Sequence, residues 1–487
     1  MRLLRRVVFW LFVAIYLTVC PLTILYAFGY LYEPGAAGGL VKTGLIYLST
    51  APPGASVYLG NGRYTQPTPT ILRDLLPGTY QVKLVLKGHR PWSQAVPVEA
   101  EKASVLEHVL LMPSTMPHTH LVPGPFEQLI PLPASDLGLL LSGDSLSGVT
   151  VYDWKHAKRW PLLPRNSPWH GARLRSHVVS HGSSDLFLRV ETREGEHSLW
   201  VELKPEVNRV EDLTRLLPKT PHAVVWDSTE GRSLCALHDG GVQCVDTVSK
   251  TPMPRIAQPV LGVGTFEKSL YLLREDGTIE RRDLEGRPVE DVPPAPRMPR
   301  TLLGARAATQ LLALSLETLL LWGERGELLM NRFPYFVVPK GVLGLEADPQ
   351  REHVLVWTKT ALGYLDVSDG TGEDLSDEGP VVHWFFTRGN HIEQAFWVYE
   401  GSHVVVRDGA HVFLLELETY GKPHRYDLLD VKPRTAVAYA ESTGQLYFLE
   451  AASGSLSSIE LLPKQELILL PFPQRREERA QRIPEEP

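Results

Sequence analysis

Residue patterns that could do chemistry are scarce in this chain of 487 residues. The sequence has no phosphate-binding glycine loop, no Gly-x-Gly-x-x-Gly, no His-Glu-x-x-His and no Gly-x-Ser-x-Gly. Ser145 comes closest to a hydrolase nucleophile, but it lies in an expected hairpin turn and not on a strand-to-helix turn. We therefore predict no catalytic residue and no cofactor.

Two segments carry side chains of metal-binding type. His118 and His120 share one face of an extended chain, but no third ligand lies nearby in sequence, which favours an exposed linker. Residues 366–378 form the densest cluster of carboxylates in the chain. Calcium prefers about six to eight oxygen ligands, but the spacing here does not match a helix–loop–helix calcium site. Because acidic loops between strands are commonly just solvated, we predict no metal site.

Cys235 and Cys244 flank an expected two-residue turn at residues 239–240, which places them opposite each other on paired strands. Counting outward from the turn puts them at a non-hydrogen-bonded pair, where Cα atoms approach most closely. A disulfide is feasible there outside the cytoplasm, and two free buried thiols are the alternative. With three cysteines in all, the chain is not a disulfide-dense scaffold.

Tryptophans are spread over the C-terminal part of the chain, as expected for core packing. Trp384, Phe385 and Phe386 are adjacent, however, and His391 follows them. These aromatic side chains are candidates for a face that stacks on sugar rings or peptides, and core packing is the alternative.

The N-terminal segment indicates on which side of a membrane any such site would lie. Residues 7–32 contain no charged side chain, and Arg2, Arg5 and Arg6 precede them. This pattern predicts a transmembrane helix at 7–32, embedded in the lipid bilayer, with residues 1–6 in the cytoplasm and the rest of the chain outside it. A cleaved export signal and a lipid attachment at Cys20 are the alternatives. The long apolar run with aromatic residues at its end, and Val19 before Cys20, favour an uncleaved anchor.

Short strands with turn signals follow a Gly-rich spacer at residues 33–43. The turn motifs, in order, are Pro53-Gly54-Ala55, Asn61-Gly62, Thr68-Pro69, Leu76-Pro77-Gly78 and Lys87-Gly88-His89. In this order residues 44–113 resemble the PEGA domain, although Pro53 stands where that family has Glu. The resemblance implies a small β-sandwich on the outer side of a bacterial or archaeal membrane, without an established catalytic residue.

Hairpins recur about every 45 residues between residues 114 and 472, and this period is typical of β-propeller blades. The turns fall at Gly148, Gly195, Gly240, Gly277, Gly326, Ala361, Gly409 and Gly454. Acidic residues close most repeats. We predict a propeller of seven or eight blades, with two unrelated β-sandwiches as the alternative. The repeat shape is similar to that of tryptophan–aspartate propellers, but the Gly-His and Trp-Asp signatures are missing. Residues 473–487 are a charged tail that we expect to be disordered.

Together these patterns predict a chain that is all-β outside the membrane. A net charge of −7 without a basic stripe argues against nucleic acid as a partner. We expect a non-enzymatic envelope protein whose propeller face binds a protein or a cell-wall glycan. The alternative is a propeller hydrolase or lyase that acts on an envelope polymer, with catalytic residues from different blades converging on the central channel.

Overall fold

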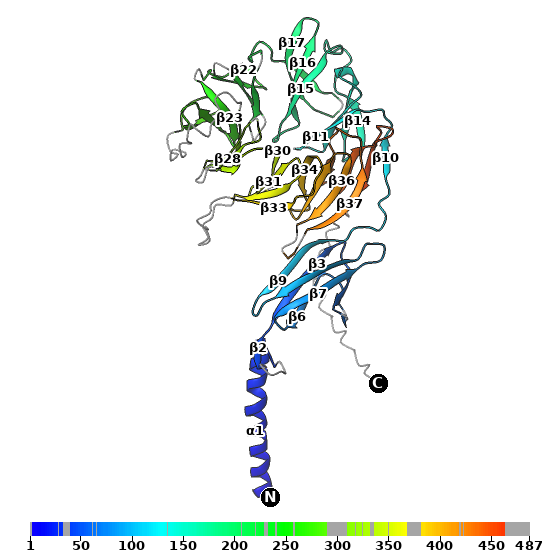
Figure 1. The fold of residues 1–487 in the computed structure, drawn as a ribbon, viewed down its shortest axis with the longest axis vertical. Helices are drawn as coiled ribbons and strands as arrows, with labels where there is room; N and C mark the ends of the chain where they lie inside the picture. The colour runs from blue at the N-terminus through cyan, green and yellow to red at the C-terminus, as the bar shows by residue number, and fades with distance from the viewer. Residues whose placement is uncertain are drawn as a thin grey trace, which may run out of the picture.

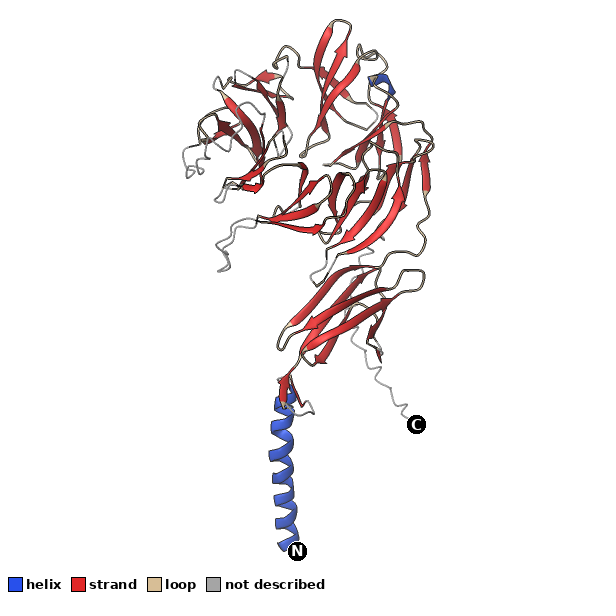
Figure 2. Ribbon diagram, viewed as in Figure 1, coloured by secondary structure: helices blue, strands red, loops and turns tan. Residues whose placement is uncertain are grey.

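The computed structural model describes residues 2–27, 29–32, 39–60, 62–64, 66–133, 135–205, 207–219, 221–227, 232–238, 241–256, 259–289, 309–316, 318–323, 325–331, 336–348, 350–367, 381–417, 420–421 and 423–462. Strands make up most of the described residues, which contain one α-helix, at the N-terminus (Figures 1 and 2).

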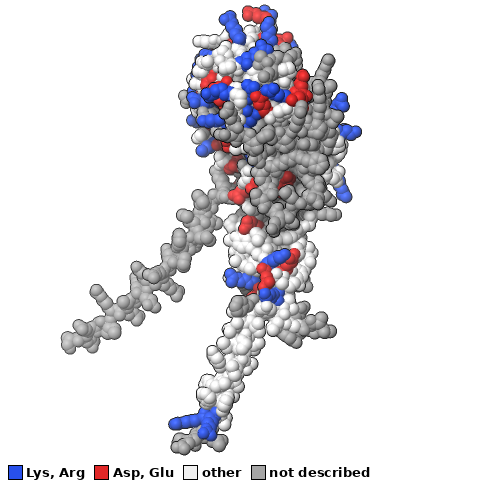
Figure 3. All heavy atoms as spheres, turned by 90° about the vertical axis from the view of Figure 1, so that its left-hand side faces the viewer, with Lys and Arg blue, Asp and Glu red and all other residues white. Residues whose placement is uncertain are grey.

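Helix α1 (Arg2–Ala27) is apolar on all sides and is long enough to cross a membrane. Figure 3 shows it free of charged side chains except for Lys or Arg near its N-terminal end. The hydroxyls of Thr18 and Thr23 donate to the carbonyls of Ala14 and Val19 one turn earlier. These two hydroxyls are thus satisfied within the helix, as an apolar surrounding requires.

A small sandwich of two sheets follows the short pair β1 (Tyr30–Tyr32) and β2 (Leu40–Lys42). One sheet has the order β6-β3-β9 and the other the order β5-β4-β7-β8. The strands are β3 (Gly44–Ala51), β4 (Ser56–Leu59), β5 (Gly62–Arg63), β6 (Thr70–Leu75), β7 (Gly78–Val85), β8 (Trp92–Val98) and β9 (Ala103–Leu110). Strand β3 alternates buried and half-buried residues along its length, so one of its faces packs in the core between the sheets.

Seven sheets make up the rest of the described chain, and because the seven-stranded one comprises two blades, the described residues form eight blades. Blade one is β11 (Gln128–Leu132), β12 (Leu137–Leu141), β13 (Val149–Asp153) and β14 (Lys158–Pro161). Blade two is β15 (Arg173–Val179), β16 (Asp185–Thr192), β17 (Gly195–Glu202) and β18 (Arg209–Asp212). Blade three is β19 (Ala223–Trp226), β20 (Ser233–His238), β21 (Gly241–Asp246) and β22 (Thr251–Pro252). Blade four is β23 (Val260–Phe266), β24 (Ser269–Arg274) and β25 (Ile279–Asp283).

The second half repeats this plan. Blade five is β26 (Thr309–Ala313), β27 (Leu319–Trp322), β28 (Leu328–Met330) and β29 (Phe336–Val338). Blade six is β30 (Val342–Ala347), β31 (His353–Thr358), β32 (Leu362–Asp366) and β33 (Val382–Phe386). Blade seven is β34 (Ile392–Val398), β35 (His403–Asp408), β36 (His411–Glu416) and β37 (His424–Asp430). Blade eight is β38 (Ala438–Ala440), β39 (Gln445–Leu449) and β40 (Leu456–Glu460), completed by β10 (Thr119–Val122).

The blades form a closed ring. Strand β10, from the start of the body, pairs with β40 at its end, so the two ends of the body share one sheet. A separate apolar cluster fills each of the eight junctions between neighbouring blades, including the junction between blades eight and one. Blades four and five also join through a parallel pairing of β23 with β26. The predicted propeller is confirmed, with eight blades in the described residues.

The repeat signal of the sequence has a structural origin. Each predicted turn that the structure describes connects the second and third strands of a blade, and the repeated acidic residue ends the third strand. Asp246 shows why an acid suits that place, because its Oδ1 accepts hydrogen bonds from the backbone of Val248 (2.9 Å) and Ser249 (2.7 Å). The carboxylate caps the turn into the fourth strand.

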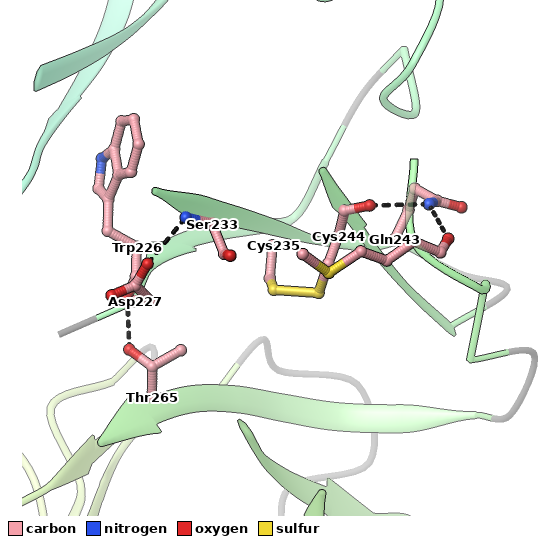
Figure 4. Close-up of a disulfide and its surroundings, with 8 residues drawn as sticks. Trp226, Asp227, Ser233, Cys235, Gln243, Cys244 and Thr265 are labelled. Carbon is pink, nitrogen blue, oxygen red and sulfur yellow. Dashed lines mark hydrogen bonds between the residues drawn. A yellow bond between two sulfur atoms is a disulfide. The ribbon is translucent and has the colours of Figure 1, made fainter. Parts of the chain in front are cut away.

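Strands β20 and β21 place Cys235 directly opposite Cys244, and a disulfide joins them (Figure 4). The two Cα atoms are 4.0 Å apart, as suits a non-hydrogen-bonded pair. Both cysteines are buried in the cluster between blades three and four. Residues 239–240 of the expected turn lie outside the described residues.

Loss of this disulfide is expected to destabilise the body. Because it closes a short loop of the unfolded chain, the Cys235→Ala/Cys244→Ala double variant should lose about 2–3 kcal/mol of unfolding free energy. Urea denaturation of the full chain in detergent micelles measures this difference. Cys20→Ala, which removes the free cysteine in α1, is the matched control and should have no effect. Equal stability of the double variant and the wild type would contradict the expectation.

Candidate functional site

An aromatic groove of about 800 Å³ lies between blades six and seven. Its walls come from β31, β32 and β33 of blade six and from β34 and loop residues of blade seven. The lining residues are His353, Tyr364, Val382, His383, Trp384, Phe385, Trp397, Gly401, Leu417, Gly421 and Pro423. None of these described residues is Asp, Glu, Lys or Arg, so the lining suits a neutral ligand.

Trp384 is the most unusual residue of the groove. Outside α1 it is the only exposed Phe, Trp or Tyr among the described residues, with 40% of its surface accessible. An exposed aromatic ring in a concave site is a typical platform for a ligand. Gly363 lies opposite it on β32, and a Cβ there would come within 3.0 Å of the indole ring. The glycine thus leaves room for the ring above the sheet.

A β-bulge explains how neighbouring residues of β33 reach the same groove. The register with β32 shifts between Leu362, which pairs with Phe386, and Gly363, which pairs with Trp384. Phe385 is the extra residue on the bulged strand. In a regular strand Trp384 and Phe385 would point to opposite faces, and the bulge re-aims one of them.

The polar groups of the groove are held by neighbouring contacts. His353 Nδ1 lies 3.4 Å from Asp348 Oδ2, and the imidazole packs edge-on against Tyr364. His383 also packs against the Tyr364 ring. Trp397 Nε1 donates to the Glu346 carbonyl of blade six at 3.3 Å, which fixes the indole across the junction between the blades. The groove therefore combines flat apolar rings with a few hydrogen-bonding atoms.

Of the aromatic residues singled out in the sequence, the structure places Trp384 and Phe385 in the groove and Phe386 outside it. Phe386 packs against Phe413 at a ring distance of 5.3 Å, in the core between the blades. His391 lies beside Glu393 and does not line the groove. No local sequence pattern marks the other groove residues, because different strands bring them together; these residues are His353, Tyr364, His383 and Trp397.

The other sequence candidates lie apart from the groove. Ser145 Oγ donates to the His170 carbonyl (3.0 Å) and caps a short 3-10 helix, so its hydroxyl has a structural role. His118 packs on Phe448, whereas His120 Nδ1 lies 2.7 Å from Glu450. No group of three or more metal-ligating side chains was found in the described part of the chain. In the acidic segment 366–378, residues 368–378 lie outside the described residues.

A second pocket, of about 380 Å³, lies beside the first strands of blades one and two. Its titratable side chains are Glu127, Asp144, Arg175 and His177. Partial loss of hydration lowers the pKa of His177, although this residue is still exposed at the surface. This pocket thus has the carboxylates and the histidine that a hydrolase, the alternative function, would need for acid–base catalysis.

The small sandwich also contacts the propeller, next to the buried His403 of β35. Ser402 Oγ donates to the Tyr399 carbonyl (2.6 Å) and so accepts from His403 Nδ1 (2.8 Å). His403 Nε2 is thereby an acceptor, and it is buried without a hydrogen-bond partner in the described residues. Burial lowers the pKa of His403 to about 4.

His403 should therefore make the fold sensitive to acid. Between pH 6.5 and about 4 the unfolded chain binds a proton that the folded protein does not bind. The unfolding free energy is expected to fall as the pH decreases through this range, and to fall less steeply in His403→Gln. Urea denaturation of both proteins at several pH values measures the difference, and parallel profiles would contradict it.

Comparison with known proteins gives one family match. The family model described as "PEGA domain" matches residues 43–110. These residues form a PEGA domain. The match confirms the resemblance seen in the turn motifs, and it coincides with the small sandwich from β3 to β9. No curated protein matches the chain.

Solved structures with some likeness to the chain include a β-propeller domain, a designed protein and a bacterial surface component. The β-propeller domain of Cps50 (Swd1) from Myceliophteria thermophila shares 14% identity with a TM-score of 0.36, over 59% of this chain and 99% of that one. The computationally designed Ika8 protein shares 12% identity with a TM-score of 0.42, over 70% and 99%. PorZ, a surface component of the type-IX secretion system of Porphyromonas gingivalis, shares 11% identity with a TM-score of 0.36, over 68% and 42%. The propeller assignment itself rests on the strand order and the ring of apolar clusters.

Proposed function

We propose that this protein is an envelope receptor, anchored by α1, that binds a neutral glycan in the aromatic groove outside the cytoplasm. The observation that carries the proposal is the exposed Trp384 in a concave site whose described lining residues include no Asp, Glu, Lys or Arg. The anchoring role is supported by the apolar helix with basic residues at its N-terminal end, which favours a cytoplasmic N-terminus. The PEGA domain supports an extracytoplasmic location for the propeller.

The groove suits a sugar chain for two physical reasons. Sugar rings present apolar C–H faces that pack on indole and phenyl rings, while their hydroxyls need scattered donors and acceptors. Trp384 and Phe385 provide the rings, and His353, His383 and Tyr364 provide polar atoms. A protein partner docking on charged side chains would find none among the described lining residues. A hydrolase or lyase function would instead use the pocket beside blades one and two.

Calorimetric titration tests the proposal with the full chain in detergent micelles. The probe is a β-1,4-linked tetramer of N-acetylglucosamine, which is a neutral cell-wall type of sugar chain. We expect saturable binding that dissociates without cleavage of the tetramer. Release of shorter sugars would favour the hydrolase alternative, and absence of any heat up to millimolar tetramer would contradict glycan binding in the groove.

A further inference from the structure

The described residues between β36 and β37 have the groove on one side and the PEGA domain on the other. Leu417, Gly421 and Pro423 of this segment line the groove. Tyr420, next to Gly421, packs against the core of the PEGA domain. Leu417 and Tyr420 also line a separate cavity of about 350 Å³ between the PEGA domain and the propeller. One wall of the groove is thus also part of the contact between the two domains.

Two side chains of strand β8 hold this segment. Trp92 Nε1 donates to Glu416 Oε2 at 2.9 Å, and Gln94 Nε2 donates to the Tyr420 carbonyl. The fit is close, because a Cβ on Gly421 would lie 2.4 Å from Gln94 Nε2. Neither Trp92 nor Gln94 lines the groove itself. The PEGA domain therefore holds the Glu416 side chain, directly before this wall, and the Tyr420 backbone within it.

Glu416 marks a departure from the blade repeat. It is blade seven's counterpart of the acids that end the third strand of other blades, such as Asp246. Asp246 caps its own turn, whereas Glu416, at 4% exposure, accepts hydrogen bonds from another domain. It also accepts from His424 Nδ1 and Tyr426 Oη, both at 3.2 Å. The Glu416 carboxylate is held rigidly by these donors, because the loss of any one hydrogen bond would leave its buried negative charge less well stabilised.

We infer that the PEGA domain acts as the outer support of the groove, and that Trp92 and Gln94 are positioning residues for ligand binding. The inference rests on the proposed function, because it concerns the same groove. It gives the PEGA domain a role beyond spacing the propeller from the membrane. A preformed wall raises affinity because the ligand does not have to order it.

The test compares Gln94→Ala and Trp92→Phe with wild type, using the full chain in detergent micelles. Trp92→Phe keeps an aromatic ring but removes the donor to Glu416 together with part of the buried ring volume. Gln81→Ala is the matched control, because Gln81 is exposed on the neighbouring strand β7. Amide hydrogen exchange of residues 416–426 is measured without ligand, and affinity for the N-acetylglucosamine tetramer is measured by calorimetry.

We expect both variants to exchange at least fivefold faster in residues 416–426 and to bind the tetramer about fivefold more weakly, with exchange in blade one unchanged. Gln81→Ala should match wild type. Unchanged exchange in both variants, or faster exchange with unchanged affinity, would overturn the inference. If wild type does not bind the tetramer, the proposed function fails, and exchange alone then decides whether the PEGA domain holds this wall.

Discussion

Trp154→Ala is expected to cost about 3–5 kcal/mol of unfolding free energy, the usual range for removing a buried tryptophan. Trp154 is 5% exposed and lies where the ring closes. Its indole packs on Tyr447 of blade eight at 4.3 Å and covers Gly138 of blade one, where a Cβ would come within 2.1 Å of the ring. Its removal leaves a cavity between the first and last blades.

Hydrogen exchange distinguishes ring opening from a general loss of stability. In Trp154→Ala, the amides of β10 and β40 should lose protection first. Trp200→Ala is the matched control, because Trp200 is equally buried but lies between blades two and three. Trp200→Ala should lower the unfolding free energy by a similar amount. In this variant the amides of β16 and β20 should lose protection first, instead of those of β10 and β40. If β10 keeps its protection in Trp154→Ala, the closure of the ring does not depend on this contact.

Trp384→Ala is expected to weaken tetramer binding about a hundredfold, or about 3 kcal/mol. The exposed part of the indole amounts to roughly 100 Å². Covering such an area is worth about 2.5 kcal/mol, and aromatic stacking adds about 0.5 kcal/mol or more. Calorimetric titration of the full chain in micelles measures the loss. The fold should be retained, because 40% of the residue's surface is already accessible to solvent.

Substitutions at two residues close to Trp384 in the sequence serve as controls for the loss of affinity. Val381→Ala removes an exposed apolar side chain directly before β33 and should leave the affinity unchanged. Phe386→Ala should reduce stability more than affinity, because Phe386 packs on Phe413 in the core. Wild-type affinity in Trp384→Ala would show that the tetramer binds elsewhere.

Local patterns predicted much of the fold. Turn residues and strand periodicity are encoded in adjacent positions, so the PEGA motifs and the repeat from Gly148 to Gly454 were visible in the sequence. Blade number was less certain because β10 joins β40 across more than three hundred residues, and such pairings leave no local signal. The opposed Cys235 and Cys244 followed from counting outward from one turn.

The candidate site was predictable only in part. Trp384 and Phe385 stood out as adjacent aromatic residues, but the bulge that turns both toward the groove depends on pairing with β32. His353 and Trp397 belong to different blades, and nothing in their own sequence surroundings distinguishes them from core residues. The support from the PEGA domain arises from Trp92 and Glu416, which are far apart in the chain and meet only in the folded protein.

The most direct test of glycan binding in the groove is photo-crosslinking with a diazirine-bearing N-acetylglucosamine tetramer. The full chain in detergent micelles is irradiated with the probe, and the modified peptides are identified by mass spectrometry. We predict cross-links on β33 and on Leu417, Gly421 or Pro423, competed away by unlabelled tetramer and lost in Trp384→Ala. Cross-links that fall on β11 and β15 instead, or that persist in Trp384→Ala, would contradict the assignment of the groove as the glycan site.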